Sequence, residues 1–207
     1  MKATIIAILA AFVLIACEER PLRPDTSASI GNILLANNTI ISPKDYSAST
    51  QTAMGVIFYA NADTVLVVAT KELGQYIYAD SLGNISNVTN DAITLCGTEN
   101  TAAILASDFY SPAALAASQY SSPIAGWSLP SAGELRRLSQ HLGKVKDAMA
   151  VVGGDAFLHE QYLSSSQDGS TSETTQRLYY AVSLENGFVT SVDKMTARNV
   201  RPILRIK

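Results

Sequence analysis

The stretch GWSLPSAGEL at residues 126–135 combines the chain's one tryptophan with a proline and a helix start. Ser131 and Glu134 have the spacing of a capping box, in which each side chain accepts a hydrogen bond from the other's backbone N–H. Ser131 is therefore expected to open a helix. The motif places the indole of Trp127 against that helix, so we expect Trp127 to be a core residue. A sugar-stacking role for Trp127 is the alternative.

The residues after this start have the period of an amphipathic helix. Leu135, Leu138 and Leu142 recur at i, i+3 and i+7, which gathers them on one apolar face. Gly143 follows as an expected helix stop. The pattern predicts a short helix whose leucines, Leu135 among them, lie in the core.

The N-terminus has the features of a secretion signal. Lys2 is followed by an apolar run at residues 3–16, shorter than the roughly 20 residues of a membrane-spanning helix. The run ends in LIAC at residues 14–17, which resembles the lipobox of bacterial lipoproteins. Residues 1–16 are thus expected to be a lipoprotein signal peptide and Cys17 the acylated first residue. An ordinary signal, with Cys17 incidental, is the alternative.

Residues 17–29 are expected to be the lipidated cysteine and a flexible tether, because they are polar, contain two prolines and offer little to bury. Glu18 and Glu19 resemble the acidic surface-export signal of Bacteroidetes lipoproteins. The expected location is therefore outside the cell, lipid-anchored to the outer membrane at the cell surface. Residues 30–207 are expected to form one domain, with residues 30–53 as an N-terminal β extension.

The charge and cysteine content of the chain limit the kinds of partner and chemistry to be expected. The formal net charge is −3 and no basic cluster occurs, which argues against nucleic acid. Beyond Cys17 the chain has only Cys96, which we expect to be a small buried hydrophobe. A reactive thiol is the weaker alternative, since no basic residue flanks it.

Hydrophobic patterns and turn residues predict strands, then helices, then strands. The expected strands lie at residues 33–35, 39–41, 54–59, 65–70, 162–165, 178–184, 188–192 and 200–206. The expected helices beyond the central one lie at residues 100–106, 113–120 and 144–152, and residues 73–93 are expected to be irregular. Residues 65–69 are apolar throughout, which predicts a strand covered on both faces. Pro202 must lie at an edge or a bulge.

Four segments carry a family resemblance. Trp127-Ser128-Leu129-Pro130-Ser131 with Glu134-Leu135 resembles the W-x-L-P-[ST]-x-x-E-L signature of bacterial surface lipoprotein domains of the Fibrobacter-type major paralogous domain family. Residues 162–166, YLSSS, resemble its Y-W-S-S strand with Leu163 in place of tryptophan, and residues 200–202, VRP, resemble its closing V-R-P. Asn100-Thr101, which opens the expected alanine-rich helix, precedes these segments in the order that the family has. The resemblance spans about residues 54–207.

This resemblance implies an α+β, C-type-lectin-like fold with an N-terminal β-hairpin, central helices and a C-terminal twisted antiparallel sheet. It implies little about function. The calcium-binding patterns of lectin-type domains, E-P-N, Q-P-D and W-N-D, do not occur in the chain. We therefore expect any ligand to be bound without calcium.

Chemical motifs are few. His141 and His159 lie 18 positions apart without Cys or acidic residues at ligand spacing, so no metal site is expected. No G-x-S-x-G, H-E-x-x-H or P-loop occurs, and no cofactor is expected. Enzymatic activity is the minority interpretation.

Recognition of a glycan or a protein partner therefore remains the leading hypothesis. The polar stretch at residues 164–175, with Ser166, Gln167 and Asp168, is the candidate contact surface, and a solvated hairpin loop is the alternative. Tyr76 and Tyr78 would share a side of an extended segment and could be further contacts or could close off the core. A structural subunit of a fimbrial or glycan-uptake assembly and an unrecognised hydrolase are the other function classes.

Overall fold

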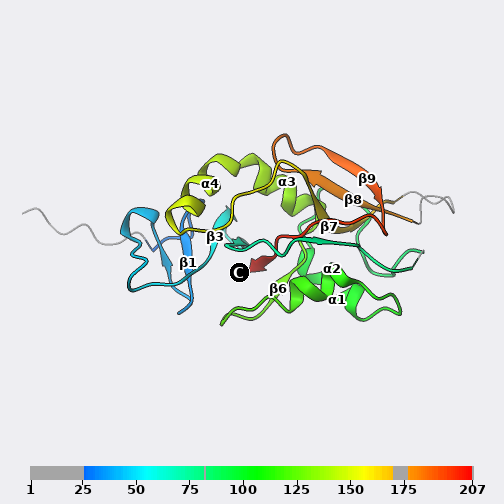
Figure 1. The fold of residues 1–207 in the computed structure, drawn as a ribbon, viewed down its shortest axis with the longest axis horizontal. Coiled ribbons are helices and arrows are strands. Elements are labelled where there is room, and N and C mark those ends of the chain that lie inside the picture. The colour runs from blue at the N-terminus through cyan, green and yellow to red at the C-terminus, as the bar shows by residue number, and fades with distance from the viewer. Residues whose placement is uncertain (1–25, 82, 170–176, 207) are drawn as a thin grey trace, which may run out of the picture.

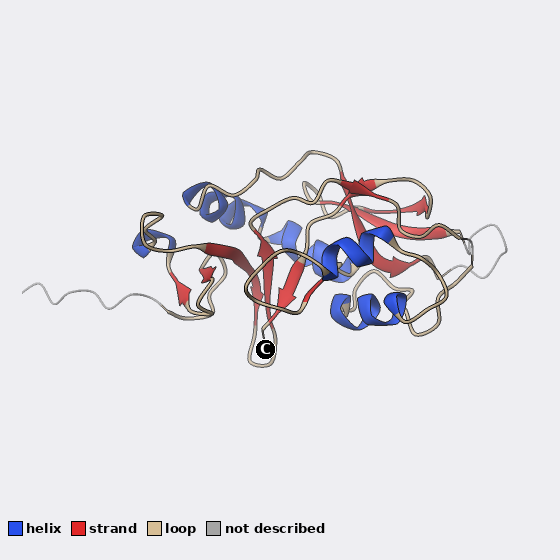
Figure 2. Ribbon diagram, turned by 60° about the horizontal axis from the view of Figure 1, so that its bottom comes forward, coloured by secondary structure: helices blue, strands red, loops and turns tan. Residues whose placement is uncertain are grey.

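A computed structural model describes residues 26–81, 83–169 and 177–206 of the chain. In these ranges the fold is mixed α+β, with four α-helices and two mostly antiparallel sheets (Figures 1 and 2). The proposed signal peptide, Cys17 and residues 170–175 of the candidate surface lie outside the described residues. No described helix has the length and apolar character needed to cross a membrane.

The first sheet joins strands from both halves of the chain, in the order β2-β1-β3-β4-β11-β6. Its strands are β1 (Ile33–Leu35), β2 (Ile40–Ile41), β3 (Ala53–Ala60), β4 (Val65–Ala69), β6 (Trp127–Ser128) and β11 (Ile203–Arg205). All five residues of β4 are buried, which confirms the prediction of a strand covered on both faces.

The second sheet has the order β5-β10-β7-β8-β9. Its strands are β5 (Gln75–Tyr76), β7 (Gln161–Gln167), β8 (Leu178–Ser183), β9 (Val189–Asp193) and β10 (Arg198–Asn199). β8 and β9 form the predicted hairpin over residues 185–187, and β10 runs parallel to β7. In the described ranges β9 and β5 are the two edge strands of this sheet, and β9 lies beside β8 in Figure 1.

The helices lie on opposite sides of the molecule (Figure 1). The pair α3 (Ala132–Gln140) and α4 (Leu142–Val151) is on one side, and α1 (Gly97–Leu105) and α2 (Pro112–Ser118) are on the other. The Ser131–Glu134 capping box is present, and Ser111 caps α2 as its position before Pro112 predicts. A 3-10 turn, η1 (Pro43–Asp45), follows β2.

The stretch at residues 126–135 sends side chains into three separate apolar clusters. Leu135 packs with alternate residues of β3 and β4 on one face of the first sheet, and Trp127 packs with the intervening residues on the other face. Leu129 enters a third cluster with α1 and α2. Trp127 is 3% and Leu135 1% exposed, so both are core residues as predicted. The placement of Trp127 against the helix was wrong, because the sheet separates the two.

Two further predictions are wrong in instructive ways. Gly143 does not end a helix but lies in the first turn of α4, where the chain restarts after a break at His141. The predicted strand at residues 200–206 is too long, because only residues 203–205 form a strand, β11 of the first sheet, while β10 of the second sheet ends at Asn199, before the predicted range. The carbonyl of Pro202 still accepts from the N–H of Ala69, so the missing donor costs the ladder little.

Candidate binding pocket at Phe157

Most of the predicted contact residues are buried. Ser166 is 0% and Gln167 2% exposed, both on β7. The Ser166 hydroxyl accepts from the N–H of Ala132, and the Gln167 amide both accepts from the N–H and donates to the carbonyl of Ile85. These residues hold the interior together and are not available to a partner. The prediction failed because a run of serines and amides has the composition of a loop and here forms a buried strand.

The two tyrosines that were predicted as contacts, Tyr76 and Tyr78, differ in their burial. Tyr78 is fully buried, donates to the carbonyl of Ser165 at 3.1 Å and stacks on Tyr179 at 5.2 Å between ring centroids. It therefore closes off the core and is not a contact. Tyr76 is half-buried on β5 and pairs with Arg198. Asp168 is half-buried, and its carboxylate accepts from the hydroxyl of Ser191 on the edge strand.

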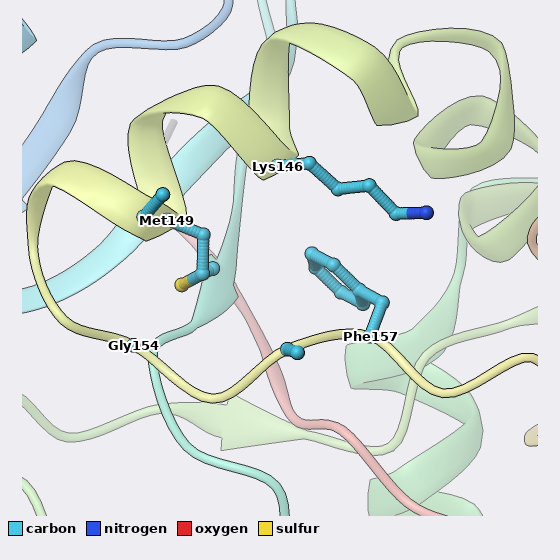
Figure 3. A pocket seen from close by; sticks show the side chains of 6 residues that line it. Lys146, Met149, Gly154 and Phe157 are labelled. Carbon is cyan, nitrogen blue, oxygen red and sulfur yellow. The ribbon is translucent and has the colours of Figure 1, made fainter.

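A different part of the fold forms an open apolar pocket of about 340 Å³. Its lining residues are Lys146, Met149 and Ala150 of α4 and Gly154, Ala156 and Phe157 of the following segment. The three helical residues are spaced i, i+3 and i+4, so they share one helix face. Figure 3 shows Met149 pointing from α4 toward Gly154, and Lys146 extending from α4 above Phe157 in this view.

Gly154 allows the segment to pass close beneath α4. A Cβ atom at this position would lie 2.3 Å from the Met149 sulfur and 3.0 Å from the carbonyl oxygen of Thr70. The N–H of Gly154 also donates to the carbonyl of Met149 at 3.0 Å. Because Gly154 has no side chain, its backbone can lie directly against Met149 and form the floor of the pocket.

Arg201 holds the other end of the segment. It is 1% exposed, and its guanidinium donates to the carbonyls of Ala69, Thr70 and Asp155 at 2.8–3.0 Å. The same group lies 4.3 Å from the centroid of the Phe157 ring, a cation–π contact. One buried arginine thus fixes both the backbone and the aromatic wall of the pocket.

The carboxylates of Glu72 and Asp155 lie in the hydrogen-bond network around Arg201. The Glu72 carboxylate accepts from Arg201 at 3.3 Å and from the hydroxyl of Tyr162 at 3.1 Å. The Asp155 carboxylate accepts from the ammonium of Lys71 and from the N–H of Glu72. Burial raises the pKa of Glu72 to about 7 even though Arg201 opposes the shift, whereas hydrogen bonds lower the pKa of Asp155.

The pocket itself offers apolar surface and one cation. Lys146 is exposed and makes no ion pair with any residue that the structure describes. The titratable groups Glu72 and Tyr162 face Arg201 and do not line the pocket. This arrangement suits capture of an apolar group that carries a nearby negative charge.

Two other kinds of site, a metal centre and a reactive cysteine, have little support among the described residues. Among the described residues no group of three or more His, Cys, Asp or Glu side chains is placed to hold a metal ion. Cys96 is half-buried rather than buried, and burial together with Glu134 raises the pKa of its thiol to about 11. A thiol with that pKa stays protonated at neutral pH and is a poor nucleophile.

No family model matches the chain, and no curated protein matches its sequence.

Sequence reasoning missed the Phe157 pocket. The V-R-P segment at residues 200–202 marked Arg201 only as part of a resemblance, and Phe157 follows a glycine pair that reads as a loop. A buried arginine partnered by carbonyls 46 to 132 residues away leaves no local pattern.

Proposed function

We propose that the chain is a calcium-independent binding module, displayed at the cell surface by a lipid anchor on Cys17, and that the Phe157 pocket receives an apolar side chain of a protein partner. The observation that carries this proposal is the apolar, open pocket held by Arg201. Its frame is preorganised, so little entropy is lost in ordering it when a partner binds.

A protein side chain suits the pocket better than a neutral sugar. Sugar hydroxyl groups that enter an apolar pocket lose water without gaining hydrogen bonds, which is unfavourable. An aliphatic or aromatic side chain gains about 1.5–3 kcal/mol from the same burial. The exposed ammonium of Lys146 adds a preference for an acidic residue beside that side chain.

The proposal includes the C-type-lectin-like fold of the family that the chain resembles. Contacts between the resembling segments support it, because the N–H of Ser165 donates to the carbonyl of Pro130 at 2.7 Å. The Ser166 hydroxyl then accepts from the N–H of Ala132 at 3.1 Å. The Y-L-S-S-S strand and the W-x-L-P-S turn therefore form one unit.

A peptide selection tests this function. The full chain, purified in detergent, is used to select from a displayed peptide library in the presence of calcium and of a chelator. We expect the selected peptides to share an aromatic or aliphatic anchor beside an acidic residue, and to bind equally in both conditions. Ala150→Phe fills the pocket from its exposed rim and should weaken binding about 10- to 100-fold.

The matched control is Ala102→Phe, which adds the same ring to an exposed alanine on α1, away from the pocket. Equal binding by Ala150→Phe and wild type would refute the pocket assignment. Binding abolished by the chelator would refute calcium independence, and hydrolysis of the selected peptides would make the protein an enzyme.

A structural subunit is the second candidate function, and the edge of the second sheet favours it. In the described ranges β9 has a neighbour on one side only, and Phe188 beside it is 70% exposed. An unpaired edge can accept a strand from another chain. Val189→Pro and Ser191→Pro would block such pairing, and assembly unchanged by either variant would exclude this role for β9.

A further inference from the structure

A second pocket, of about 240 Å³, lies along α3 from Gly133 to Gln140. Its lining residues are Ala92, Ile93, Gly133, Arg136, Arg137 and Gln140. It shares no lining residue with the Phe157 pocket, and the side chains that dominate it are polar and cationic.

The wall opposite α3 is fixed in place. A Cβ atom at Gly133 would lie 2.5 Å from the backbone of Ile93, so this glycine lets the wall rest directly on the helix. The Asp91 carboxylate accepts from the N–H groups of Ile93 and Thr94 at 2.8 and 2.7 Å. The carboxylate nearest in sequence to the wall is thus occupied by its own turn.

The two arginines retain most of their donors. Arg136 donates to the carbonyl of Ala92 at 3.2 Å, and Arg137 donates to the side-chain oxygen of Gln140 at 3.1 Å while lying 5.7 Å from the ring centroid of Tyr59. Each guanidinium has five N–H donors. These contacts orient both groups and leave several donors on each for a ligand.

Neither arginine has a counter-ion among the described residues. Three other arginines pair with carboxylates, namely Arg177, Arg201 and Arg205. Two adjacent guanidinium groups without such a partner create a local positive potential on a chain whose net charge is negative. An anion would relieve that repulsion.

The pocket also has an apolar wall. Ile93 is 70% exposed, among the most exposed large hydrophobic side chains of the described surface. The pocket volume is below the roughly 300–1,000 Å³ of sites for drug-sized ligands, which indicates a ligand unit of about one ring.

We propose that this pocket binds the carboxylate-bearing ring of an acidic saccharide, a hexuronate unit. The planar carboxylate matches the fork of the arginine donors at Arg136 and Arg137. The apolar face of the ring packs on Ile93, and the amide of Gln140 serves the ring hydroxyls. An acidic peptide would satisfy the arginines but would leave the ring-sized apolar part of the pocket unused.

The experiment is a calorimetric titration of the full chain in detergent with D-galacturonate and a galacturonate trimer. D-galactose, inorganic phosphate and a glutamate-rich peptide are the comparison ligands. We expect the trimer to bind with an affinity that falls as salt rises, and each comparison ligand to bind at least about tenfold more weakly. Galactose binding as tightly as galacturonate, or phosphate or the peptide binding more tightly, would overturn the proposal.

Variants locate the site. Arg137→Gln removes an exposed guanidinium and should weaken binding about 10- to 100-fold, as expected for loss of hydrogen bonds to a charged group. Arg137→Lys keeps the charge without the fork and should restore only part of the affinity. Arg198→Gln is the control, because Arg198 also lacks a carboxylate partner in the described ranges and lies on β10.

Arg136→Gln should weaken binding similarly, and its thermal unfolding is measured in parallel because Arg136 also holds the carbonyl of Ala92. If that variant is unfolded, Arg137→Gln decides alone. Equal affinity of Arg137→Gln and wild type, or an equal loss in Arg198→Gln, would overturn the assignment. Ala150→Phe should leave this binding unchanged, which separates the result from the fate of the Phe157 pocket.

Discussion

The Glu134 carboxylate accepts a hydrogen bond from the N–H of Gly97 at 3.1 Å, although 37 positions separate the two residues. The same oxygen accepts from the N–H of Ser131 at 2.8 Å. One buried side chain therefore accepts hydrogen bonds from the first turns of both α1 and α3 and holds the two helix N-termini together.

Gly97→Ala tests the closeness of this contact. A Cβ atom at Gly97 would lie 2.2 Å from the Glu134 oxygen and 2.7 Å from the carbonyl oxygen of Leu129. We expect the substitution to lower the free energy of unfolding by about 1–3 kcal/mol, because it forces these groups apart. Chemical denaturation measures the change.

Gly143→Ala is its control, since a Cβ atom there meets nothing within 4 Å and the residue lies inside α4. This substitution should stabilise the protein by about 0.5–1 kcal/mol. Destabilisation by both substitutions to the same extent would contradict the contact.

Stability should fall as pH rises through neutrality. Burial raises the pKa of Glu134 and that of Glu72 to about 7, from 4.5 in the unfolded chain. The folded state then binds protons more tightly, so this contribution is complete below pH 4.5 and is lost as pH passes 7. Asp91 and Asp155 have lowered pKa values and act in the opposite sense below about pH 4.

We therefore expect the free energy of unfolding to be highest near pH 4.5 and lower by about 1–3 kcal/mol at pH 8. Denaturation across this range gives the profile. Glu72→Gln cannot titrate and should flatten the decline between pH 5 and 8. A decline as steep in that variant as in wild type would show that Glu72 does not contribute as described.

Gln167→Ala should be destabilising. It removes both hydrogen bonds to Ile85 and the contact at 3.0 Å from the ammonium of Lys194, which is itself buried. Each buried polar group left without a partner costs about 1–3 kcal/mol. A thermal melt within one degree of wild type would contradict the structural role, and Gln119→Ala on the surface serves as control.

Leu135→Ala should lower the free energy of unfolding by about 2–5 kcal/mol, because Leu135 is 1% exposed in the cluster shared by α3, β3 and β4.

The fluorescence of Trp127, on the other face of that sheet, is an independent test of burial. The indole is 3% exposed and its N–H has no hydrogen-bond partner among the described residues, so its fluorescence should be blue-shifted until the protein unfolds. Native emission at the wavelength of free tryptophan in water would be inconsistent with this burial.

Cys17→Ala should prevent acylation and leave the precursor unprocessed. A single acyl chain gives marginal membrane binding and two or more give stable anchoring, at about 0.8 kcal/mol per buried CH₂. Phase separation of a detergent extract measures the partition. Wild type in the aqueous phase would refute lipidation, and Cys96→Ala, which keeps the lipobox, should partition like wild type.

Local signals predicted the elements of this fold well and their partners poorly. The capping box at Ser131 and the proline-led start of α2 depend on neighbours within one turn, so the sequence reveals them. The polar run at residues 164–167 looked exposed because its partners, Ala132 and Ile85 among them, are distant in the chain. The same holds for Arg201, whose contacts define the Phe157 pocket only after the sheets have formed.

The position of β10 and β11, which follow each other closely at the end of the chain but belong to different sheets, has a kinetic consequence. β10 lies between β5 and β7, and β11 lies between β4 and β6, so residues 198–205 complete both sheets. All the other described strands are synthesised earlier. The first sheet cannot be completed until β11 is present, because β11 pairs Ile203 with Val68, which is far away in the sequence. A polypeptide that lacks these eight residues lacks the strand between β4 and β6 in the first sheet and the strand between β5 and β7 in the second. If the chain is exported as proposed, this late closure would keep it loose enough to be threaded through a membrane channel before it folds.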